Sequence, residues 1–270
     1  MSTQADKGRA FRALHERPEA FIVPNPWDIG TARLLAGLGF EALATTSAGY
    51  AFSAGRRDGT IGRDEMLAHV AAIASATDLP VSGDLENGYG DDPATVADTI
   101  TRAAAAGLAG GSIEDLSGRD GAVYELGHAV DRIRAAVEAA RRLPFPFTLT
   151  ARAENYLAGR PDLADTVARL QAYQEAGADV LYAPGLRSAE EIASVVVAVD
   201  RPVNVVMGLR GAQLSLAALS ALGVKRVSVG SALSRAALGA LLRAAGEMRE
   251  HGTFAFADHA VSYPEISALF

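Results

Sequence analysis

Eight short apolar runs, often β-branched, alternate along the chain with longer amphipathic stretches rich in Ala and Leu. Gly, Pro, Asp and Ser separate the segments, a pattern typical of strand–helix units around a parallel sheet. The predicted strands are residues 21–23, 42–46, 81–86, 111–115, 147–152, 180–183, 203–206 and 226–229. The predicted helices include residues 64–77, 93–106, 126–142, 162–176, 189–199 and 231–249.

Eight strand–helix units within 270 residues favour a closed (β/α)8 TIM barrel over an open sheet. A barrel of this kind takes about 250 residues. No linker interrupts the alternation, so we expect residues 1–270 to form a single barrel domain. Gly follows several predicted helices, where it tolerates the left-handed conformation that closes the last turn; examples are Gly39, Gly107, Gly177 and Gly223.

The composition excludes several kinds of chemistry. The chain has no Cys, which removes disulfides, thiolate metal sites and thiol catalysis. Its two lysines, Lys7 and Lys225, lie in the N-terminal segment and just before the eighth predicted strand. Neither position is at the mouth of the predicted barrel, so a Schiff-base mechanism is not expected.

The charge and hydropathy patterns indicate a cytoplasmic protein without a nucleic-acid or membrane partner. The net charge of −7 is spread along the sequence, with no basic stripe of the kind that binds nucleic acid. No apolar run approaches the length of about 18 residues that crosses a bilayer. The first residues contain no apolar stretch of signal-peptide type.

Carboxylates gather at the predicted carboxyl ends of the strands, where such barrels carry their active sites. Alternation along the third strand places Asp84 and Glu86 on one face, and Glu114 ends the fourth strand. Asp58 lies in the irregular stretch 47–62 after the second strand. Four converging carboxylates need a cation or an Arg to offset their repulsion. A set of oxygen ligands favours Mg2+ or Mn2+ over Zn2+.

The histidines do not add to this set, because none of the five ends a predicted strand. They are His15, His69, His128, His251 and His259. We interpret His69 as a residue on a helix face and His128 as a capping or surface residue.

Arg152, at the end of the fifth strand, shares a face with Thr150 and Glu154 and has two readings. It either binds an anionic substrate, or it pairs with Glu114 and Glu86 in a structural ion network. Buried charges at the top of a barrel are costly without a functional reason, which favours the first reading.

A second candidate for binding an anion is Ser47 with the backbone N–H groups of Ala48 and Gly49, which can hold a carboxylate. The helix N-terminus after the eighth strand is a position suited to phosphate, but we interpret it as an ordinary strand–helix turn.

Four segments, in order, resemble the isocitrate lyase/phosphoenolpyruvate mutase family. They read PNPWDIGTARLLAGLGFEALATTSAGYAFSAGRRDG, GDLENGYGD, GSIED and TARAENY, and the similarity runs from about residue 21 to the helix after residue 229. The resemblance implies a (β/α)8 barrel that binds Mg2+ and makes or breaks C–C or P–C bonds next to a 2-oxo acid. It also implies an enolate-type intermediate and a homo-oligomer, a dimer or tetramer with a swapped C-terminal helix.

The resemblance also implies roles for the acidic residues at the mouth. Asp84 resembles the principal Mg2+ ligand, and it also contacts the substrate through the metal site. Glu86 stands where the family commonly has a second Asp. Asp58 and Glu114 resemble the carboxylates that hold the water molecules of the metal, and Glu114 is counted with the metal set. Asp58, Glu114 and Arg152 are the expected catalytic residues.

The remaining expected residues bind substrate. Ser47, Ala48 and Gly49 resemble the segment that binds the substrate carboxylate. Arg152 resembles the arginine that stabilises the charge of substrate and enolate, and Asn204 resembles a further carboxylate contact.

The stretch after the fourth strand departs from the family. It reads LSGRDGAVYELGH and contains neither the K-[KR]-C-G-H sequence of isocitrate and methylisocitrate lyases nor a K-T-N type sequence. Those two lyase activities are therefore not expected. The polar groups available in this predicted lid are Arg119, Asp120, Tyr124 and Glu125.

Three functions are compatible with these residues. The leading one is a Mg2+-dependent lyase or hydrolase that cleaves a C–C bond in a small 2-oxo or 2-hydroxy (di)carboxylate. The second is a 2-oxo acid binding protein with weak or no turnover, which the missing acid or base in the lid supports. The third is an enzyme that acts on the P–C bond of a phosphonopyruvate-type substrate.

Overall fold

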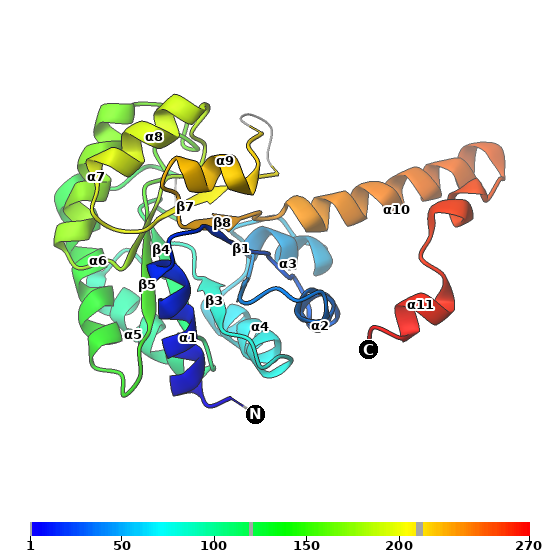
Figure 1. Ribbon diagram of the computed structural model, residues 1–270, viewed down its shortest axis with the longest axis horizontal. Helices are drawn as coiled ribbons and strands as arrows, with labels where there is room; N and C mark the ends of the chain where they lie inside the picture. Colours follow the sequence, from blue (N-terminus) through cyan, green and yellow to red (C-terminus); the bar gives the residue numbers. More distant parts are fainter. Residues whose placement is uncertain (1, 119–120, 209–212) are drawn as a thin grey trace.

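The computed structural model describes residues 2–118, 121–208 and 213–270, and these form an eight-stranded parallel barrel surrounded by helices (Figure 1). The (β/α)8 prediction is therefore confirmed. The strands are β1 (Phe21–Val23), β2 (Leu43–Ala44), β3 (Val81–Asp84), β4 (Gly110–Glu114), β5 (Thr148–Arg152), β6 (Val180–Tyr182), β7 (Val203–Val206) and β8 (Arg226–Ser228).

The strands follow one another around the barrel in the order β1-β8-β7-β6-β5-β4-β3-β2, and every paired ladder is parallel. Two hydrogen bonds span the gap between β1 and β2. The Ala44 N–H donates to the carbonyl of Pro24 (3.1 Å), and the Asn25 side chain donates to the carbonyl of Thr45 (3.0 Å). The sheet is thereby almost completely closed.

Helices cover the outside of the barrel between successive strands (Figure 1). Gly39, Gly107, Gly177 and Gly223 follow four of them with positive φ, as predicted. The helices are α1 (Gln4–Glu16), α2 (Ile29–Gly37), α3 (Ser47–Ser53), α4 (Arg63–Ser75), α5 (Pro93–Ala105), α6 (Leu126–Arg141), α7 (Leu163–Glu175), α8 (Ala189–Ala198), α9 (Leu216–Ala221), α10 (Ala232–His251), the 3-10 helix η1 (Ala255–His259) and α11 (Tyr263–Ser267).

Helix α1 closes the N-terminal end of the barrel, opposite the mouth. Phe11 and Leu14 pack with Phe21 and Ala109, which lie where strands begin. Packing of this kind fills the bottom of a TIM barrel with side chains. The carboxyl ends of the strands are left as the face where a site can form.

The differences from the sequence prediction that matter for the site lie at the mouth. Strand β2 is only two residues long, and the stretch 47–62, expected to be irregular, contains helix α3. Strand β3 ends at Asp84, and Glu86 has a left-handed backbone with φ of 49°. The strand alternation used to place Asp84 and Glu86 on one face therefore does not apply beyond Asp84.

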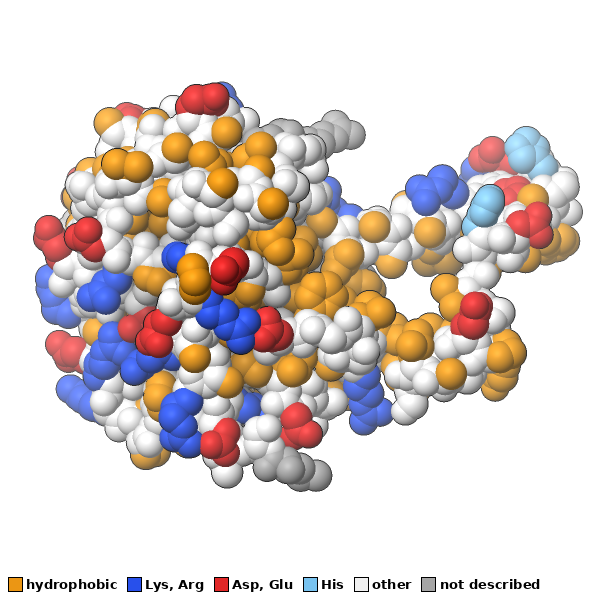
Figure 2. Space-filling view, viewed as in Figure 1, with side chains coloured by type: hydrophobic (Ala, Val, Ile, Leu, Met, Phe, Trp, Pro, Cys, Tyr) orange, Lys and Arg blue, Asp and Glu red, His pale blue; other side chains and the backbone are white. Residues whose placement is uncertain are grey.

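Helix α10 projects from the barrel as an arm, and the last residues fold back beside it (Figure 1). Ser234 is the one buried residue of α10, all of which the structure describes. Hydrophobic side chains gather on the arm and on the part of the barrel that faces it (Figure 2). The exposed ones of residues 233–270 are Leu233, Leu241, Leu242, Met248, Phe254, Val261, Tyr263, Leu269 and Phe270.

Within residues 2–118, 121–208 and 213–270, no helix is both long and apolar enough to cross a lipid bilayer.

Candidate active site

A pocket of about 550 Å³ opens at the carboxyl ends of the strands and extends into the barrel. Its lining includes every predicted site residue except Gly49, and it also reaches side chains deeper in the barrel. The predicted lining residues are Ser47, Ala48, Asp58, Asp84, Glu86, Glu114, Arg152 and Asn204. The residues predicted from strand ends and those implied by the family resemblance thus lie around one pocket.

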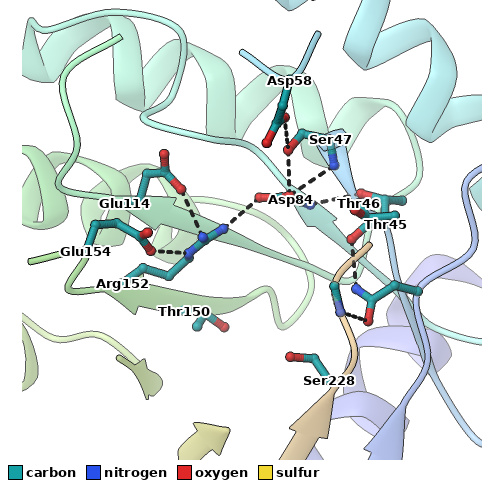
Figure 3. Close-up of polar contacts among 12 residues, drawn as sticks. Thr45, Thr46, Ser47, Asp58, Asp84, Glu114, Thr150, Arg152, Glu154 and Ser228 are labelled. Carbon is teal, nitrogen blue, oxygen red and sulfur yellow. Dashed lines mark hydrogen bonds and ion pairs between the residues drawn. The ribbon is translucent and has the colours of Figure 1, made fainter. Parts of the chain in front are cut away.

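Arg152 lies at the centre of the mouth and bonds with three carboxylates from three strand ends (Figure 3). Its guanidinium nitrogens lie 2.9 Å from Asp84, 3.1 Å from Glu114 and 2.8 Å from Glu154. β5 pairs with β4 in register, so that Arg152 stands directly beside Glu114. The predicted partner Glu86 is not among the ion pairs that the structure shows, and Glu154 and Asp84 take that place.

Asp84 is held from its other side by Ser47. The Ser47 backbone N–H and hydroxyl both donate to Asp84 Oδ2, over 3.0 Å and 2.9 Å (Figure 3). Ser47 is the first residue of α3, so its N–H has no partner within the helix and is free to bond outward. The Ser47 hydroxyl also lies 3.3 Å from Asp58 Oδ1, which links the two carboxylates.

Gly49 is placed differently from the prediction. Its N–H donates to the Thr46 hydroxyl that caps α3, and the residue is buried. A Cβ at this position would lie 2.6 Å from Thr46 Cγ2 and 3.0 Å from Trp27 Cβ. Close packing therefore accounts for this glycine, whereas Ser47 and Ala48 face the pocket.

Two of the carboxylates at the mouth, Glu114 and Asp58, have raised pKa values. Burial raises the pKa of Glu114 well above its usual range, although the Arg152 charge opposes the shift. Loss of hydration and the neighbouring Asp84 charge raise the pKa of Asp58. Burial alone would lower the pKa of Arg152, but the charges of Glu154, Glu114 and Asp84 outweigh it and raise that pKa. One guanidinium therefore does not neutralise the whole cluster.

Glu86 is the least satisfied of these groups. Its Oε1 is buried and has no hydrogen-bond partner within the described chain. Burial, together with the charges of Asp84 and Asp58, raises the pKa of Glu86 to about 8. Its left-handed backbone, unusual for a residue with a Cβ, is the kind of strain that persists at functional sites.

The chemistry of this donor set fits Mg2+. The ligating atoms are all carboxylate or hydroxyl oxygens, and an orphaned carboxylate oxygen and raised carboxyl pKa values are what a nearby cation would relieve. No three Asp, Glu or His side chains converge tightly enough to hold a metal by themselves in the described part of the chain. Mg2+ commonly keeps several waters and uses only one or two carboxylates plus substrate. A site without three converging protein ligands is therefore still compatible with Mg2+.

Two of the four polar groups of the predicted lid, Tyr124 and Glu125, belong to the described residues. Tyr124 bonds through its hydroxyl to Asp91 (2.6 Å) and Asn87 (3.1 Å) and does not line the pocket. Glu125 caps the start of α6 without a side-chain bond to that helix. Arg119 and Asp120 lie outside the described residues. Leu116, Ser117, Gly118 and Gly121 line the pocket from this side.

The five histidines are absent from the described lining of the pocket. His69 is buried on α4 and stacks on Tyr50, with 3.7 Å between ring centroids, which confirms its helix-face interpretation. Lys7 and Lys225 donate to backbone carbonyls of residues 74, 77, 17 and 18. Neither lysine lines the pocket.

Two features of the site were not predicted: Glu154 is a partner of Arg152, and Arg226 lines the pocket. Glu154 follows β5, and its N–H donates to Asp115 Oδ1 over 2.8 Å, which fixes the chain where it leaves the barrel. Its two-residue spacing from Arg152 was a usable signal. Arg226 begins β8, where polar residues are not normally sought, and no sequence pattern marked it.

Comparison with known proteins identifies the family of the chain. The sequence model of the phosphoenolpyruvate phosphomutase family matches residues 11–249. A solved structure from Burkholderia cenocepacia J2315, described in general terms as a lyase/mutase, is 66% identical with a TM-score of 0.96. That match covers 98% of this chain and 95% of the other.

Two further relatives carry more specific names. An oxaloacetate decarboxylase of Chromohalobacter salexigens is 31% identical over 256 residues, which cover 92% of this chain and 87% of the relative. The structure of an oxaloacetate acetylhydrolase in complex with oxalate is 26% identical with a TM-score of 0.89 and covers 100% of this chain and 95% of that chain.

These relatives are lyases and hydrolases that act on carbon–carbon bonds, which supports an enzyme of that class. The chain belongs to the phosphoenolpyruvate mutase/isocitrate lyase family.

Proposed function

We propose that this enzyme is Mg2+-dependent and cleaves a C–C bond of a small 2-oxo or 2-hydroxy dicarboxylate through an enolate-type intermediate. The observation that carries the proposal is the position of Arg152 among Asp84, Glu114 and Glu154. A guanidinium held by three carboxylates cannot reorient, so it presents fixed N–H donors to the pocket. Preorganised donors of this kind stabilise charge that develops on an oxygen.

The mouth carboxylates would hold the metal. Asp84 and Glu86 are the candidate ligands, and Asp58 and Glu114 would hold its water molecules. Mg2+ would supply polarisation of a carbonyl or hydroxyl oxygen and offset the negative charge of the mouth. Ser47 keeps Asp84 oriented through two hydrogen bonds.

Glu86, as a candidate ligand, would be ionised once Mg2+ is bound, so proton transfer falls to Glu114. Burial raises the pKa of Glu114, which can therefore hold a proton and return it to an enolate carbon. This would replace the lid Cys that the sequence lacks. The described lid residues Ser117, Tyr124 and Glu125 are not needed for that step.

A four-carbon 2-oxo dicarboxylate is the substrate class to test first, because two relatives are named for oxaloacetate. NMR with oxaloacetate distinguishes pyruvate and CO2 from oxalate and acetate. The same assay run with a 2-methylmalate-type acid and with phosphonopyruvate covers the malate-type and P–C alternatives. Turnover that requires Mg2+ and exceeds the rate of the metal alone is the expected result.

The control for this assay is a matched pair of variants. Arg152→Lys should lower turnover about 10²- to 10³-fold, whereas Asp131→Asn, in an exposed helix pair with Arg134, should not change it. Oxaloacetate bound in the presence of Mg2+ but not converted would instead favour a 2-oxo acid binding protein. Turnover that is equal with and without a chelator would overturn the metal requirement.

The exposed apolar side chains of helix α10 support a homo-oligomer. Helix α10 is about 30 Å long at 1.5 Å per residue, and Leu241 and Leu242 are 61% and 71% exposed. Apolar faces of this extent are typical of subunit interfaces. A homo-oligomer, a dimer or tetramer in which α10 packs on a neighbouring barrel, would cover them.

A further inference from the structure

Arg226 lies inside the barrel, below the mouth, and is only 5% exposed. Its Nε donates to Asn204 Oδ1 over 2.8 Å and its Nη2 to Thr150 Oγ1 over 2.9 Å. Its Nη1 lies 3.5 Å from His15 Nε2. Arg226 therefore bridges β8, β7, β5 and helix α1 across the barrel interior.

None of these three partners carries a negative charge. Burial, followed by the Arg226 charge, lowers the pKa of His15 to about 3, so this ring is neutral. Burial also lowers the pKa of Arg226, but only to about 10, so Arg226 is a cation at neutral pH. The ion pairs of the described residues include no carboxylate for Arg226, although such a buried charge is costly unless it is paired.

The described pocket lining contains two basic side chains, Arg152 and Arg226, and they differ in whether they bond with carboxylates. Arg152 is neutralised by three carboxylates, whereas Arg226 has only neutral acceptors. A guanidinium has five N–H donors, and the three contacts of Arg226 use three of them. Two donors are left for a ligand in the pocket that Arg226 lines.

The walls around Arg226 are polar as well. Ser82, Ser112 and Ser228 line the pocket with Asn204, whose Nδ2 donates to the Ser228 hydroxyl over 3.0 Å. Both ends of the Asn204 amide are thus engaged with the barrel interior. The predicted carboxylate contact of Asn204 would be made through Arg226, which Asn204 orients.

The rise along β5 from Thr150, which Arg226 bonds, to Arg152 fits a short dianion. Thr150, which accepts from Arg226, precedes Arg152 by two residues on β5 (Figure 3). Two residues of a strand span about 6.6 Å. A four-carbon dicarboxylate can therefore place one carboxylate at the mouth and the other one layer deeper.

We propose that Arg226, with Thr150, Asn204 and Ser228, forms an anion well in the barrel interior that binds the second carboxylate of the substrate. This inference rests on the proposed function for the identity of the ligand as a dicarboxylate. It adds the residue that selects dicarboxylates over monocarboxylates, while Arg152 and the mouth carboxylates act on the 2-oxo end.

The test compares two 2-oxo acids by calorimetry in the presence of Mg2+. Pyruvate has one carboxylate, and 3,3-difluorooxaloacetate has two and lacks the hydrogens needed for enolisation. In Arg226→Gln we expect binding of the dicarboxylate to weaken about 10- to 100-fold, as for loss of a hydrogen bond to a charged group. Pyruvate binding should change less than about twofold, well below that hydrogen-bond value.

Three controls keep the outcome interpretable. Arg102→Gln removes a positive charge from an exposed pair with Asp64, outside the pocket, and should leave both affinities unchanged. Arg226→Lys keeps the charge and should retain part of the selectivity. If Arg226→Gln does not fold, Thr150→Val removes one anchor of Arg226 and should weaken dicarboxylate binding selectively by a smaller factor.

Equal weakening of both ligands, or no change in either, would show that Arg226 has a structural role only and would overturn the inference. Failure of the proposed function gives a different result, because these titrations need no turnover. Selective loss of dicarboxylate binding without any reaction would retain the anion well and reject the enzymatic proposal alone.

Discussion

Arg152 Nη1 donates to Asp84 Oδ1 over 2.9 Å, so the principal predicted metal ligand and the principal predicted substrate ligand are bonded to each other. Ser47 occupies the other oxygen of Asp84. A metal ion at Asp84 would share this carboxylate with Arg152 and Ser47. Metal binding and the orientation of Arg152 are therefore coupled, and a change at one should alter the other.

Replacing Arg152 tests this coupling. Arg152→Lys keeps a positive charge, but a single ammonium nitrogen cannot take the places of the three guanidinium nitrogens that bond with the carboxylates. We therefore expect kcat to fall about 10²- to 10³-fold. Arg152→Met leaves Asp84, Glu114 and Glu154 without their cation and should lower the free energy of unfolding by about 3–5 kcal/mol. Urea unfolding and steady-state kinetics measure the two effects. A stable, active Arg152→Met enzyme would contradict both.

Removing the charge of Asp84 should weaken metal binding. Asp84→Asn keeps the size of the side chain and loses the anionic oxygen, so Mg2+ affinity should fall at least about tenfold. Calorimetric titration with Mg2+ measures this directly. Asp131→Asn, on the exposed face of α6, is the matched control and should bind as the wild type does. Identical isotherms for the two variants would move the metal site elsewhere.

Glu86 should make stability fall as pH rises. Its pKa is raised from the ordinary value of 4.5 to about 8, so the folded protein holds a proton that the unfolded chain loses. The free energy of unfolding therefore decreases from pH 4.5 to about 8. Without divalent cations, the wild type should lose more stability than Glu86→Gln across this window, as measured by urea unfolding at a series of pH values. Parallel profiles would show that Glu86 does not contribute.

The arm should control assembly. Leu241→Glu with Leu242→Glu places two charges on the exposed apolar face of α10 and should shift the sedimentation coefficient toward that of the monomer. Val197→Glu is the control, because Val197 is 86% exposed on α8 of the barrel. A wild type that sediments as a monomer at all concentrations would rule out the proposed oligomer.

We expect that a side chain at position 110 cannot be accommodated without a loss of stability. A Cβ there would lie 2.6 Å from the carbonyl oxygen of Thr148 in the neighbouring strand. Gly110→Ala should therefore destabilise the barrel by about 1–3 kcal/mol, the usual cost of overpacking. Gly37→Ala, at a helical position with nothing within 4 Å, should instead leave stability unchanged or raise it by about 0.5–1 kcal/mol. Denaturant midpoints distinguish the two.

Strand ends were the part of the site that the sequence could predict. Hydrophobic alternation places β3, β4 and β5, and barrel geometry then brings Asp84, Glu114 and Arg152 to one mouth. The ion pairs among them follow from strand register, because Glu114 and Arg152 are directly paired. The local sequence pattern and the barrel topology were sufficient to bring these three residues together.

Other features depended on contacts that no local pattern encodes. The left-handed backbone of Glu86 is set by the surrounding chain after β3 ends, so Glu86 lines the pocket as predicted although strand alternation does not extend to it. The role of Gly49 in packing depends on Trp27, which lies 22 positions earlier. Arg226 was missed because its partners, Thr150 and His15, come from distant segments.

Lys7 and Lys225 both bond to backbone carbonyls at the end of the barrel opposite the mouth. Reagents that couple to lysine side chains would therefore attach the protein to a surface by its closed end and leave the pocket facing solution. Because the chain contains no Cys, a single cysteine introduced at Gly118 would carry the only thiol. A fluorophore placed there would report ligand entry at the pocket wall without competing sites.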